Sequence, residues 1–235
     1  MRVDPHRPAK FREIDDLVEN LAREIVSRLN AAVDKRGTAS LVVPGGSTPG
    51  LLFDALSRRD ADWHRVTVTV CDERWAPADK KDSNEHLVRT RLLKLRAADA
   101  KFVSMNTKAA TAAEGEAEVE AAIAAMRRPF DVTVLGMGPD GHIASLIPNS
   151  PELAAGLDIN APNLVRAVTA DGARGSSERM TLTLKALVGS RFVALMITGQ
   201  AKLAAYEHAC DPGSELELPV RALLRRAPVN TYWTA

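Results

Sequence analysis

The sequence predicts an α/β protein, one α/β/α domain over residues 1–235 in which helices cover both faces of a mainly parallel sheet. Short apolar runs typical of buried strands alternate along the chain with segments of helical periodicity. Such alternation requires crossover connections between parallel strands. The chain has 235 residues, 46% of them hydrophobic, which is enough for one core. We find no internal repeat, low-complexity block or linker that would mark a second domain.

The predicted elements of the N-terminal half begin with an amphipathic helix over residues 11–33, where Leu17, Leu21 and Ile25 recur at helical spacing. The elements that follow are a buried strand in SLVVP (40–44), a tight loop opening a helix in GGSTPGLLFDALSRR (45–59), a strand followed by a loop in RVTVTVCDERW (65–75), and a helix in SNEHLVRTRLLKL (83–95).

The C-terminal half continues the alternation. Its predicted elements are an Ala- and Glu-rich surface helix (111–128), strands in FDVTVLGMG (130–138) and RFVALMITG (191–199), a helix in QAKLAAYEHAC (200–210), a short helix from Pro219, and a last strand in VNTYWT (229–234). The segment ADGARGSSE (170–178) has the composition of a mobile loop rather than of a domain boundary.

Charge and composition exclude several classes of protein. The 31 basic and 30 acidic residues nearly cancel, which argues against nucleic-acid binding through bulk charge. No run reaches 18 apolar residues, and the start MRVDPHRPAKFR lacks the apolar core of a signal peptide. Cys71 and Cys210 have no metal-ligand spacing and are expected to be reduced thiols. We therefore expect a cytoplasmic protein with no metal, no membrane segment and no nucleic-acid partner, either a monomer or a small homo-oligomer.

The unusual polar residues follow predicted strands, so they are expected at one edge of the sheet. In an open parallel sheet, ligands bind in the crevice outside the carboxyl ends of the strands. The residues that we expect there are Gly45, Gly46, Ser47 and Thr48 after one strand, Asp72 and Arg74 after the next, Asp140 and His142 after the third, and Lys202 after the fourth. Their coincidence at one edge carries more weight than any single motif.

The first of these loops, PGGSTPG, favours an anion. Its glycines allow a tight turn, Ser47 or Thr48 can cap the next helix, and Pro49 suits the first helical turn. Free N–H groups at a helix N-terminus bind phosphate readily. An ordinary strand-to-helix turn has the same composition. The spacing matches neither a Walker A loop nor a G-x-S-x-G nucleophile elbow.

Three cations are candidates for holding such an anion. Arg74 offers a planar fork that can hold phosphate or carboxylate through two hydrogen bonds, although an ordinary surface ion pair would also account for the Asp72–Arg74 stretch. Lys202 lies near the start of a helix, where a cation is disfavoured unless an anion is nearby. Arg179 follows the 170–178 segment and is either a phosphate ligand or a plain surface arginine. Trp75 is either a lid or a packed aromatic.

The stretch VTVLGMGPDGHIASLIP (132–148) contains G-x-G-x-x-G, which is typical of dinucleotide-binding turns. That reading requires a helix directly after the turn and an acidic residue about 20 positions on at a strand end. Pro139, Pro148 and Pro151 interrupt any long helix, and Asp158 follows no strand. We therefore interpret the stretch as a glycine turn that exposes a histidine, the side chain whose unperturbed pKa lies nearest neutrality. His142 is the predicted catalytic residue, with Asp140 orienting it or contacting a substrate hydroxyl.

Taken together, these motifs resemble the 6-phosphogluconolactonases, within the larger group that includes the glucosamine-6-phosphate deaminases. The matching segments are GGSTP (45–49), DERW (72–75), DSNEH (82–86), GMGPDGHIASLIP (136–148), RMTLTL (179–184) and TGQAK (198–202). After DGHIA the deaminases typically have Phe-Asn-Glu, whereas this chain has Ser145, Leu146 and Ile147. Trp75 within DERW also favours the lactonase branch.

The resemblance implies a Rossmann-like fold of the NagB/RpiA type and no metal or organic cofactor. It also implies a sugar-phosphate lactone substrate, 6-phospho-D-glucono-1,5-lactone, hydrolysed to 6-phosphogluconate in the oxidative pentose phosphate route. Our hypothesis is that His142 activates water and then protonates the ring oxygen. Backbone N–H groups of the glycine turns would stabilise the oxyanion. Substrate and phosphate would be held by the 45–48 loop, Asp72, Arg74 and Lys202, with Arg179 a further candidate.

Two other functions are compatible with the same motifs. An isomerase or deaminase acting on glucosamine 6-phosphate would use the same phosphate site but needs an additional acid near His142, for which Glu152 is the one nearby candidate. A sugar-phosphate sensor without turnover would need a DNA- or partner-binding appendage, and only one helix precedes the first predicted strand.

Overall fold

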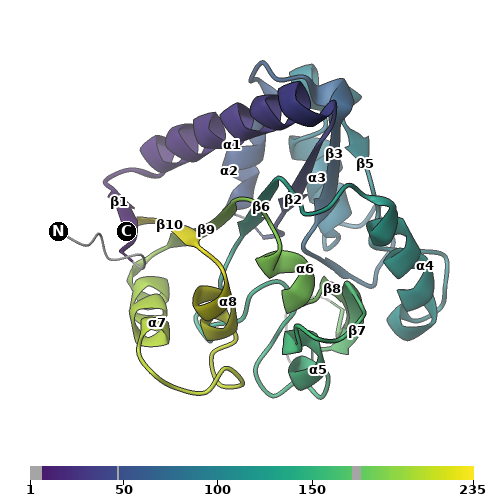
Figure 1. Ribbon diagram of the computed structural model, residues 1–235, viewed down its shortest axis with the longest axis vertical. Helices are drawn as coiled ribbons and strands as arrows, with labels where there is room; N and C mark the ends of the chain where they lie inside the picture. The colour runs from purple at the N-terminus through teal and green to yellow at the C-terminus, as the bar shows by residue number, and fades with distance from the viewer. Residues whose placement is uncertain (1–6, 47, 171–175) are drawn as a thin grey trace.

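The computed structural model describes residues 7–46, 48–170 and 176–235 and is built around a seven-stranded sheet (Figure 1). The strands follow the order β1-β10-β9-β6-β2-β3-β5, and every pairing in this sheet is parallel. Their bounds are β1 (Ala9–Phe11), β2 (Ala39–Val43), β3 (Val66–Val70), β5 (Lys101–Phe102), β6 (Val132–Leu135), β9 (Val193–Thr198) and β10 (Val229–Thr234). The predicted α/β class with a mainly parallel sheet is confirmed.

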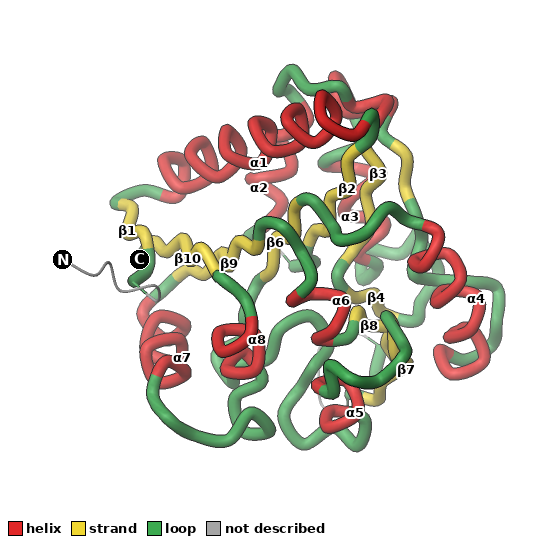
Figure 2. Tube along the Cα trace, in the orientation of Figure 1, coloured by secondary structure: helices red, strands yellow, loops and turns green. Residues whose placement is uncertain are grey.

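Helices cover both faces of this sheet, as Figures 1 and 2 show. On one side lie α1 (Ile14–Arg36) and α2 (Pro49–Ser57), and on the other lie α7 (Gln200–Cys210) and α8 (Val220–Arg226). The remaining α-helices of the described chain are α3 (Asn84–Arg91), which packs on α2, α4 (Ala112–Ala125), α5 (Leu153–Leu157) and α6 (Leu184–Val188), which packs on α8. Two short 3₁₀ helices, Trp63–Arg65 and Leu95–Asp99, lie in the connections.

A second, antiparallel sheet was not predicted. Its strands β4 (Asp72–Arg74), β8 (Glu178–Leu182) and β7 (Val165–Thr169) follow the order β4-β8-β7. The prediction of a loop directly after the 66–70 strand was therefore wrong, because residues 72–74 pair with a segment about a hundred residues away. Of the predicted mobile loop, residues 171–175 lie outside the described residues, and Glu178 begins β8.

The amphipathic helix α1 supplies one layer of the core. Its residues Leu17, Leu21, Ile25 and Leu29 have no exposed surface, which agrees with the predicted periodicity. The helix ends at Gly37, whose φ of 78° gives the left-handed C-cap and whose N–H donates to Val33 O at 2.7 Å.

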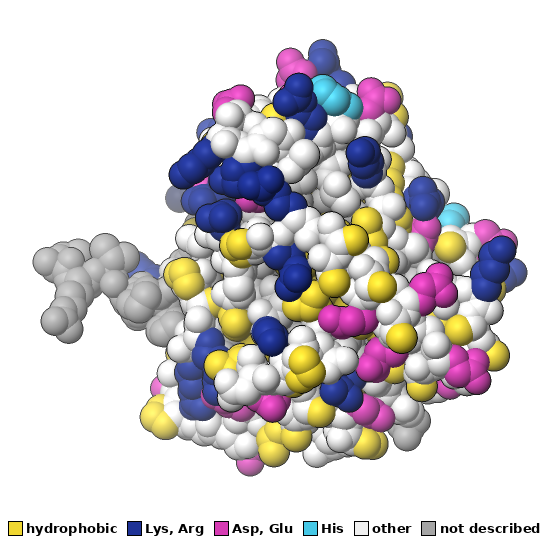
Figure 3. Space-filling view, turned by 45° about the vertical axis from the view of Figure 1, so that its right-hand side comes forward, with side chains coloured by type: hydrophobic (Ala, Val, Ile, Leu, Met, Phe, Trp, Pro, Cys, Tyr) yellow, Lys and Arg dark blue, Asp and Glu magenta, His cyan; other side chains and the backbone are white. Residues whose placement is uncertain are grey.

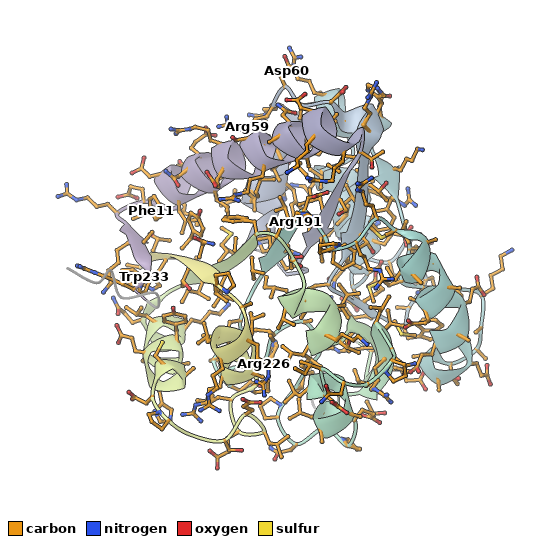
Figure 4. All side chains as sticks on the ribbon, viewed as in Figure 1. Phe11, Arg59, Asp60, Arg191, Arg226 and Trp233 are labelled. Atoms are coloured by element: carbon orange, nitrogen blue, oxygen red, sulfur yellow. The ribbon has the colours of Figure 1, made fainter. Side chains whose placement is uncertain are left out.

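The edge of the parallel sheet at β1 and β10 fixes the start of α7. In Figure 4, Phe11 and Trp233 lie at this edge. The indole N–H of Trp233 donates to Gly199 O at 3.0 Å, and Gly199, with φ 84°, immediately precedes α7. The last strand therefore helps to place the helix that carries Lys202.

The outer strand of the small sheet is protected by carboxylates. Glu120 of α4 accepts from the N–H groups of Leu164 and Val165, both at 2.9 Å, and Glu116 accepts from Ala167 N–H at 2.7 Å. These carboxylates occupy the hydrogen-bonding groups that an added strand would use.

Acidic and basic side chains are interspersed over much of the face shown in Figure 3, in line with the near-zero net charge. Within the described ranges, no helix combines the length and the apolar character needed to cross a membrane.

Candidate active site

A cavity of about 420 Å³ opens at the carboxyl edge of the parallel sheet, where the sequence predicted the site. The predicted residues that line it are Gly45, Gly46, Asp72, Arg74, His142, Arg179 and Lys202. It is also lined by Pro44, Cys71, Asn84, Gly136, Met137, Gly138, Pro139 and Ala144. Five stretches that are distant in the sequence, 44–46, 71–84, 136–144, 179 and 202, thus meet at one cavity. Four of them follow strands of the parallel sheet, as in other open α/β sheets, and Arg179 comes from β8 of the small sheet.

Not every predicted residue lies on the cavity wall. Asp140 is exposed and hydrogen-bonded to His142 but does not line the cavity, and Ser47 is outside the described residues. Thr48 occupies the N-cap position of α2 but makes no side-chain cap hydrogen bond and does not line the cavity. Of the loop residues that the structure describes, Gly45 and Gly46 line the cavity, and Gly46 has a φ of 98°.

His142 and Asp140 form a close pair in a glycine turn. His142 Nδ1 lies 2.6 Å from Asp140 Oδ1, and this hydrogen bond is the main cause of a lowered pKa of the Asp140 carboxyl. Because an ionised carboxylate only accepts, Nδ1 carries the shared proton and Nε2 is the ring nitrogen presented to a ligand. The arrangement fits a base that takes a proton at Nε2 while Asp140 fixes the tautomer and stabilises the imidazolium.

Glycines make this pair sterically feasible. A Cβ at Gly138 would lie 2.2 Å from His142 Nδ1 and 2.4 Å from Asp140 Oδ1. Gly141 has a φ of 75°, and its N–H donates to Gly138 O at 3.1 Å, while Gly138 N–H donates to His142 O at 2.9 Å. The glycine pattern therefore serves close packing around a histidine rather than a dinucleotide.

Asp72 is the buried carboxylate of the cavity wall. Ser145 Oγ donates to its Oδ2 at 2.6 Å, Cys71 Sγ donates to its Oδ1 at 3.2 Å, and Arg179 Nη1 lies 3.9 Å from Oδ2. Burial and then the charge of Asp72 raise the pKa of the Cys71 thiol well above its ordinary value, so the thiol stays protonated as a donor. Sequence reasoning missed the role of Ser145.

Glu73 has a structural role at the start of α3. It is fully buried and accepts from the N–H groups of Arg74, Asn84 and Glu85, each at 2.7 Å, and from Ser83 Oγ at 3.0 Å. Burial raises its pKa, and these hydrogen bonds oppose the rise. The carboxylate caps a helix N-terminus instead of forming the surface ion pair considered from the sequence.

Asn84 is a cavity residue that the sequence analysis did not single out. Its Nδ2 donates to Asp72 O at 2.8 Å, and a Cβ at Gly45 would lie 2.0 Å from its Oδ1. The signal was present in DSNEH, whose position ten residues after DERW places its helix start beside β4, the strand that begins at Asp72.

Three cationic side chains face the cavity, against one carboxylate. Arg179 is buried, so the interpretation as a plain surface arginine is wrong. Burial is the main cause of a lowered pKa at both Arg179 and Lys202, which means that each is partly desolvated. Arg74 is held by a hydrogen bond from Nη1 to Asp82 O at 2.6 Å. The arrangement favours an anionic ligand.

Trp75 and Glu152 are both engaged elsewhere. The Trp75 indole N–H donates to Ala109 O at 3.2 Å, and its ring packs so closely on α4 that a Cβ at Gly115 would lie 2.4 Å from it. Trp75 is thus a packed aromatic in this structure. Glu152 accepts from the N–H of Thr169 at 3.1 Å on β7 and does not line the cavity. Across the described residues, no three or more His, Cys, Asp or Glu side chains are grouped to hold a metal ion.

The fold and the cavity define an α/β protein with a histidine–aspartate pair beside a cation-lined pocket at the carboxyl edge of a parallel sheet. The model of one family, described as glucosamine-6-phosphate isomerases/6-phosphogluconolactonase, matches residues 12–233, and the chain belongs to this family.

Three similar proteins all carry the name of the lactonase branch of the family. The chain is 43% identical to a 6-phosphogluconolactonase of Rhizobium meliloti, over 95% of this chain and 96% of the relative. It is 40% identical to a 6-phosphogluconolactonase of Pseudomonas aeruginosa, over 91% and 88% of the two chains. The crystal structure of a 6-phosphogluconolactonase from Shewanella baltica superposes with a TM-score of 0.92 at 42% identity, covering 96% of each chain. The expected relationship is confirmed.

Proposed function

We propose that this protein is a 6-phosphogluconolactonase that hydrolyses 6-phospho-D-glucono-1,5-lactone to 6-phosphogluconate in the oxidative pentose phosphate pathway of the cytoplasm, acting as one domain without a metal or organic cofactor. The observation that carries the proposal is the His142–Asp140 pair beside a cavity lined by Arg74, Arg179 and Lys202. The names of the relatives, at 40% and 43% identity, support the same substrate.

The reaction needs only an added water and a protonated leaving group. In the proposed mechanism, Nε2 of neutral His142 takes a proton from water as the oxygen attacks C1 of the lactone. The C1–O5 bond of the tetrahedral intermediate then breaks, and the imidazolium returns the proton to the ring oxygen. Asp140, bound to Nδ1, stabilises the transient imidazolium, because its lowered pKa keeps it ionised.

The substrate is held by charge at the other walls of the cavity. We assign its phosphate and developing oxyanion to the backbone of Gly45 and Gly46 together with Arg74, Arg179 and Lys202. The amides of Gly138 and Gly141 are used inside their own turn and are therefore poor oxyanion donors. Asp72, whose oxygens are fixed by Ser145 and Cys71, is assigned to a sugar hydroxyl.

The geometry does not favour deamination of glucosamine 6-phosphate. The acid proposed for that reaction from the sequence, Glu152, is bound to the edge of β7. The test is proton release from freshly generated 6-phosphogluconolactone in weak buffer, compared with spontaneous hydrolysis. Release well above the spontaneous rate is expected. A trace equal to the uncatalysed one, together with ammonia release from glucosamine 6-phosphate, would replace this proposal with the deaminase function.

A further inference from the structure

The loop between α7 and α8, residues 211–219, packs directly on the turn that carries His142. The N–H of Val220 donates to Gly141 O at 2.9 Å. The side chain of Leu218 is so close to Gly141 that a Cβ there would lie 2.6 Å from Leu218 Cδ2 and 3.2 Å from its Cα. Gly141 immediately precedes His142, so this contact reaches the catalytic pair through one peptide unit.

The same loop is held in place by a buried arginine of α8. Arg221 is only 2% exposed, and its guanidinium donates to Ser214 O at 3.1 Å and to His208 O at 3.0 Å. A Cβ at Gly213 would lie 2.4 Å from the guanidinium carbon, so the loop wraps closely around it. Because leaving a buried cation without these partners is costly, Arg221 and the carbonyls of Ser214 in the loop and His208 in α7 hold one another in place.

Leu218 contacts the histidine turn but does not line the cavity. It is half-buried against the core and is absent from the lining of the cavity. The cavity walls that carry Arg74, Arg179 and Lys202 come from other segments. A change at Leu218 can therefore alter the placement of His142 while leaving the cationic part of the site intact.

We propose that Leu218, held by the Arg221-anchored loop, is a positioning residue that fixes the Gly141–His142 turn for catalysis; this inference rests on the proposed lactonase function. Catalytic rates depend steeply on placement, and displacement of a reacting group by about 1 Å can cost roughly 100-fold. Removing the Leu218 side chain should therefore lower kcat by about 10-fold or more through a looser turn. KM should change little, because the anion-binding side chains do not move.

The test compares Leu218→Ala with Leu216→Ala, a control at a residue of the same loop that is 50% exposed. Both kcat and KM for lactone hydrolysis are measured, together with the NMR chemical shifts of the His142 ring in the free proteins. We expect a lower kcat and shifted ring signals for Leu218→Ala alone, and recovery of both in Leu218→Met.

Equal kcat values and equal ring signals in the two alanine variants would overturn the inference. Turnover by the wild-type protein in the same experiment would leave the proposed function standing. A fall in kcat without any change in the ring signals would also overturn it. If the wild-type protein showed no turnover, the proposed function would fail, and unchanged ring signals in Leu218→Ala would independently refute the positioning role.

Discussion

The hydroxyl of Ser145 donates a 2.6 Å hydrogen bond to the carboxylate of Asp72, and both side chains are buried. Ser145 follows the His142 turn, whereas Asp72 begins β4 of the small sheet. The backbone N–H of Ser145 also donates to Thr181 Oγ1 at 3.1 Å, and Thr181 is the register partner of Asp72 on β8. This relationship ties the histidine turn to the second sheet.

Replacing Ser145 by alanine should weaken this tie. A hydrogen bond to a charged group is worth about 1.5–3 kcal/mol, so the free energy of unfolding should fall by that order. KM for the lactone should rise, because Asp72 would lose a donor that fixes its oxygens. The control is Ser150→Ala, since the buried Ser150 hydroxyl has no hydrogen-bond partner within the described residues. Equal denaturation midpoints and KM values in the two variants would refute the role of Ser145.

Asp140→Asn should lower kcat by about 10-fold to 100-fold, the factor that corresponds to losing a charge-assisted hydrogen bond of about 1.5–3 kcal/mol.

The hydrogen bond between Asp140 and His142 lowers the pKa of Asp140 below the ordinary 3.8. Ionised Asp140 therefore stabilises the fold above pH 3.8, and this contribution is lost as the pH falls through the lowered pKa.

The corresponding measurement follows the free energy of unfolding of wild type and Asp140→Asn by urea titration from neutral to strongly acidic pH. The difference between the two proteins should shrink as the pH falls below about 5 and Asp140 becomes protonated. A difference that grew between about pH 5 and the strongly acidic range would show that Asp140 is not stabilised as the anion.

Lys202→Met should weaken binding of the substrate and of inorganic phosphate as a competitive inhibitor. The lowered pKa of Lys202 reflects burial, so this cation acts in a partly desolvated site where an anion gains more from it than in bulk water. We expect KM and the phosphate inhibition constant to rise by about 10-fold, with kcat less affected. A fall in kcat at constant KM would instead place Lys202 at the oxyanion.

Glu120→Ala should destabilise the small sheet, because the N–H groups of Leu164 and Val165 would lose their acceptor. The loss should cost about 1–3 kcal/mol in the free energy of unfolding and should promote association through the exposed edge of β7. Thermal unfolding and light scattering are the measurements. Glu118→Ala, an exposed position on the same helix, is the control and should behave as wild type.

Most of the parallel sheet and its helices were predictable because their signals are local, but the short edge strands β1 and β5 were not predicted, and Phe11, predicted to be helical, belongs to β1. The periodicity of α1 and the apolar runs of β2, β3, β6 and β9 each lie within one short segment. The small sheet was not predictable in this way. Strand β4 has only three residues and is stabilised by pairing with β8, so its own sequence carries little β signal.

In the candidate site, too, some residues could be placed from local sequence signals and others only from contacts between distant segments. His142, Arg74 and Lys202 follow strands of a parallel sheet, and topology alone brings them to one cavity. The contacts of Ser145 with Asp72, and of Asn84 with Gly45, depend on how loops fold over the sheet edge. Glu73 looked like one member of a surface ion pair, but folding buries it as a helix cap. The expectation of a single domain stays a prediction.

The most direct test of the central claim is the rate of proton release from 6-phosphogluconolactone with His142→Ala in place of the wild-type protein. If His142 is the general base, the catalysed rate should fall by about 10²–10⁴-fold. Affinity for 6-phosphogluconate should survive, because the cations of the cavity are untouched. An unchanged catalysed rate in His142→Ala would contradict the account.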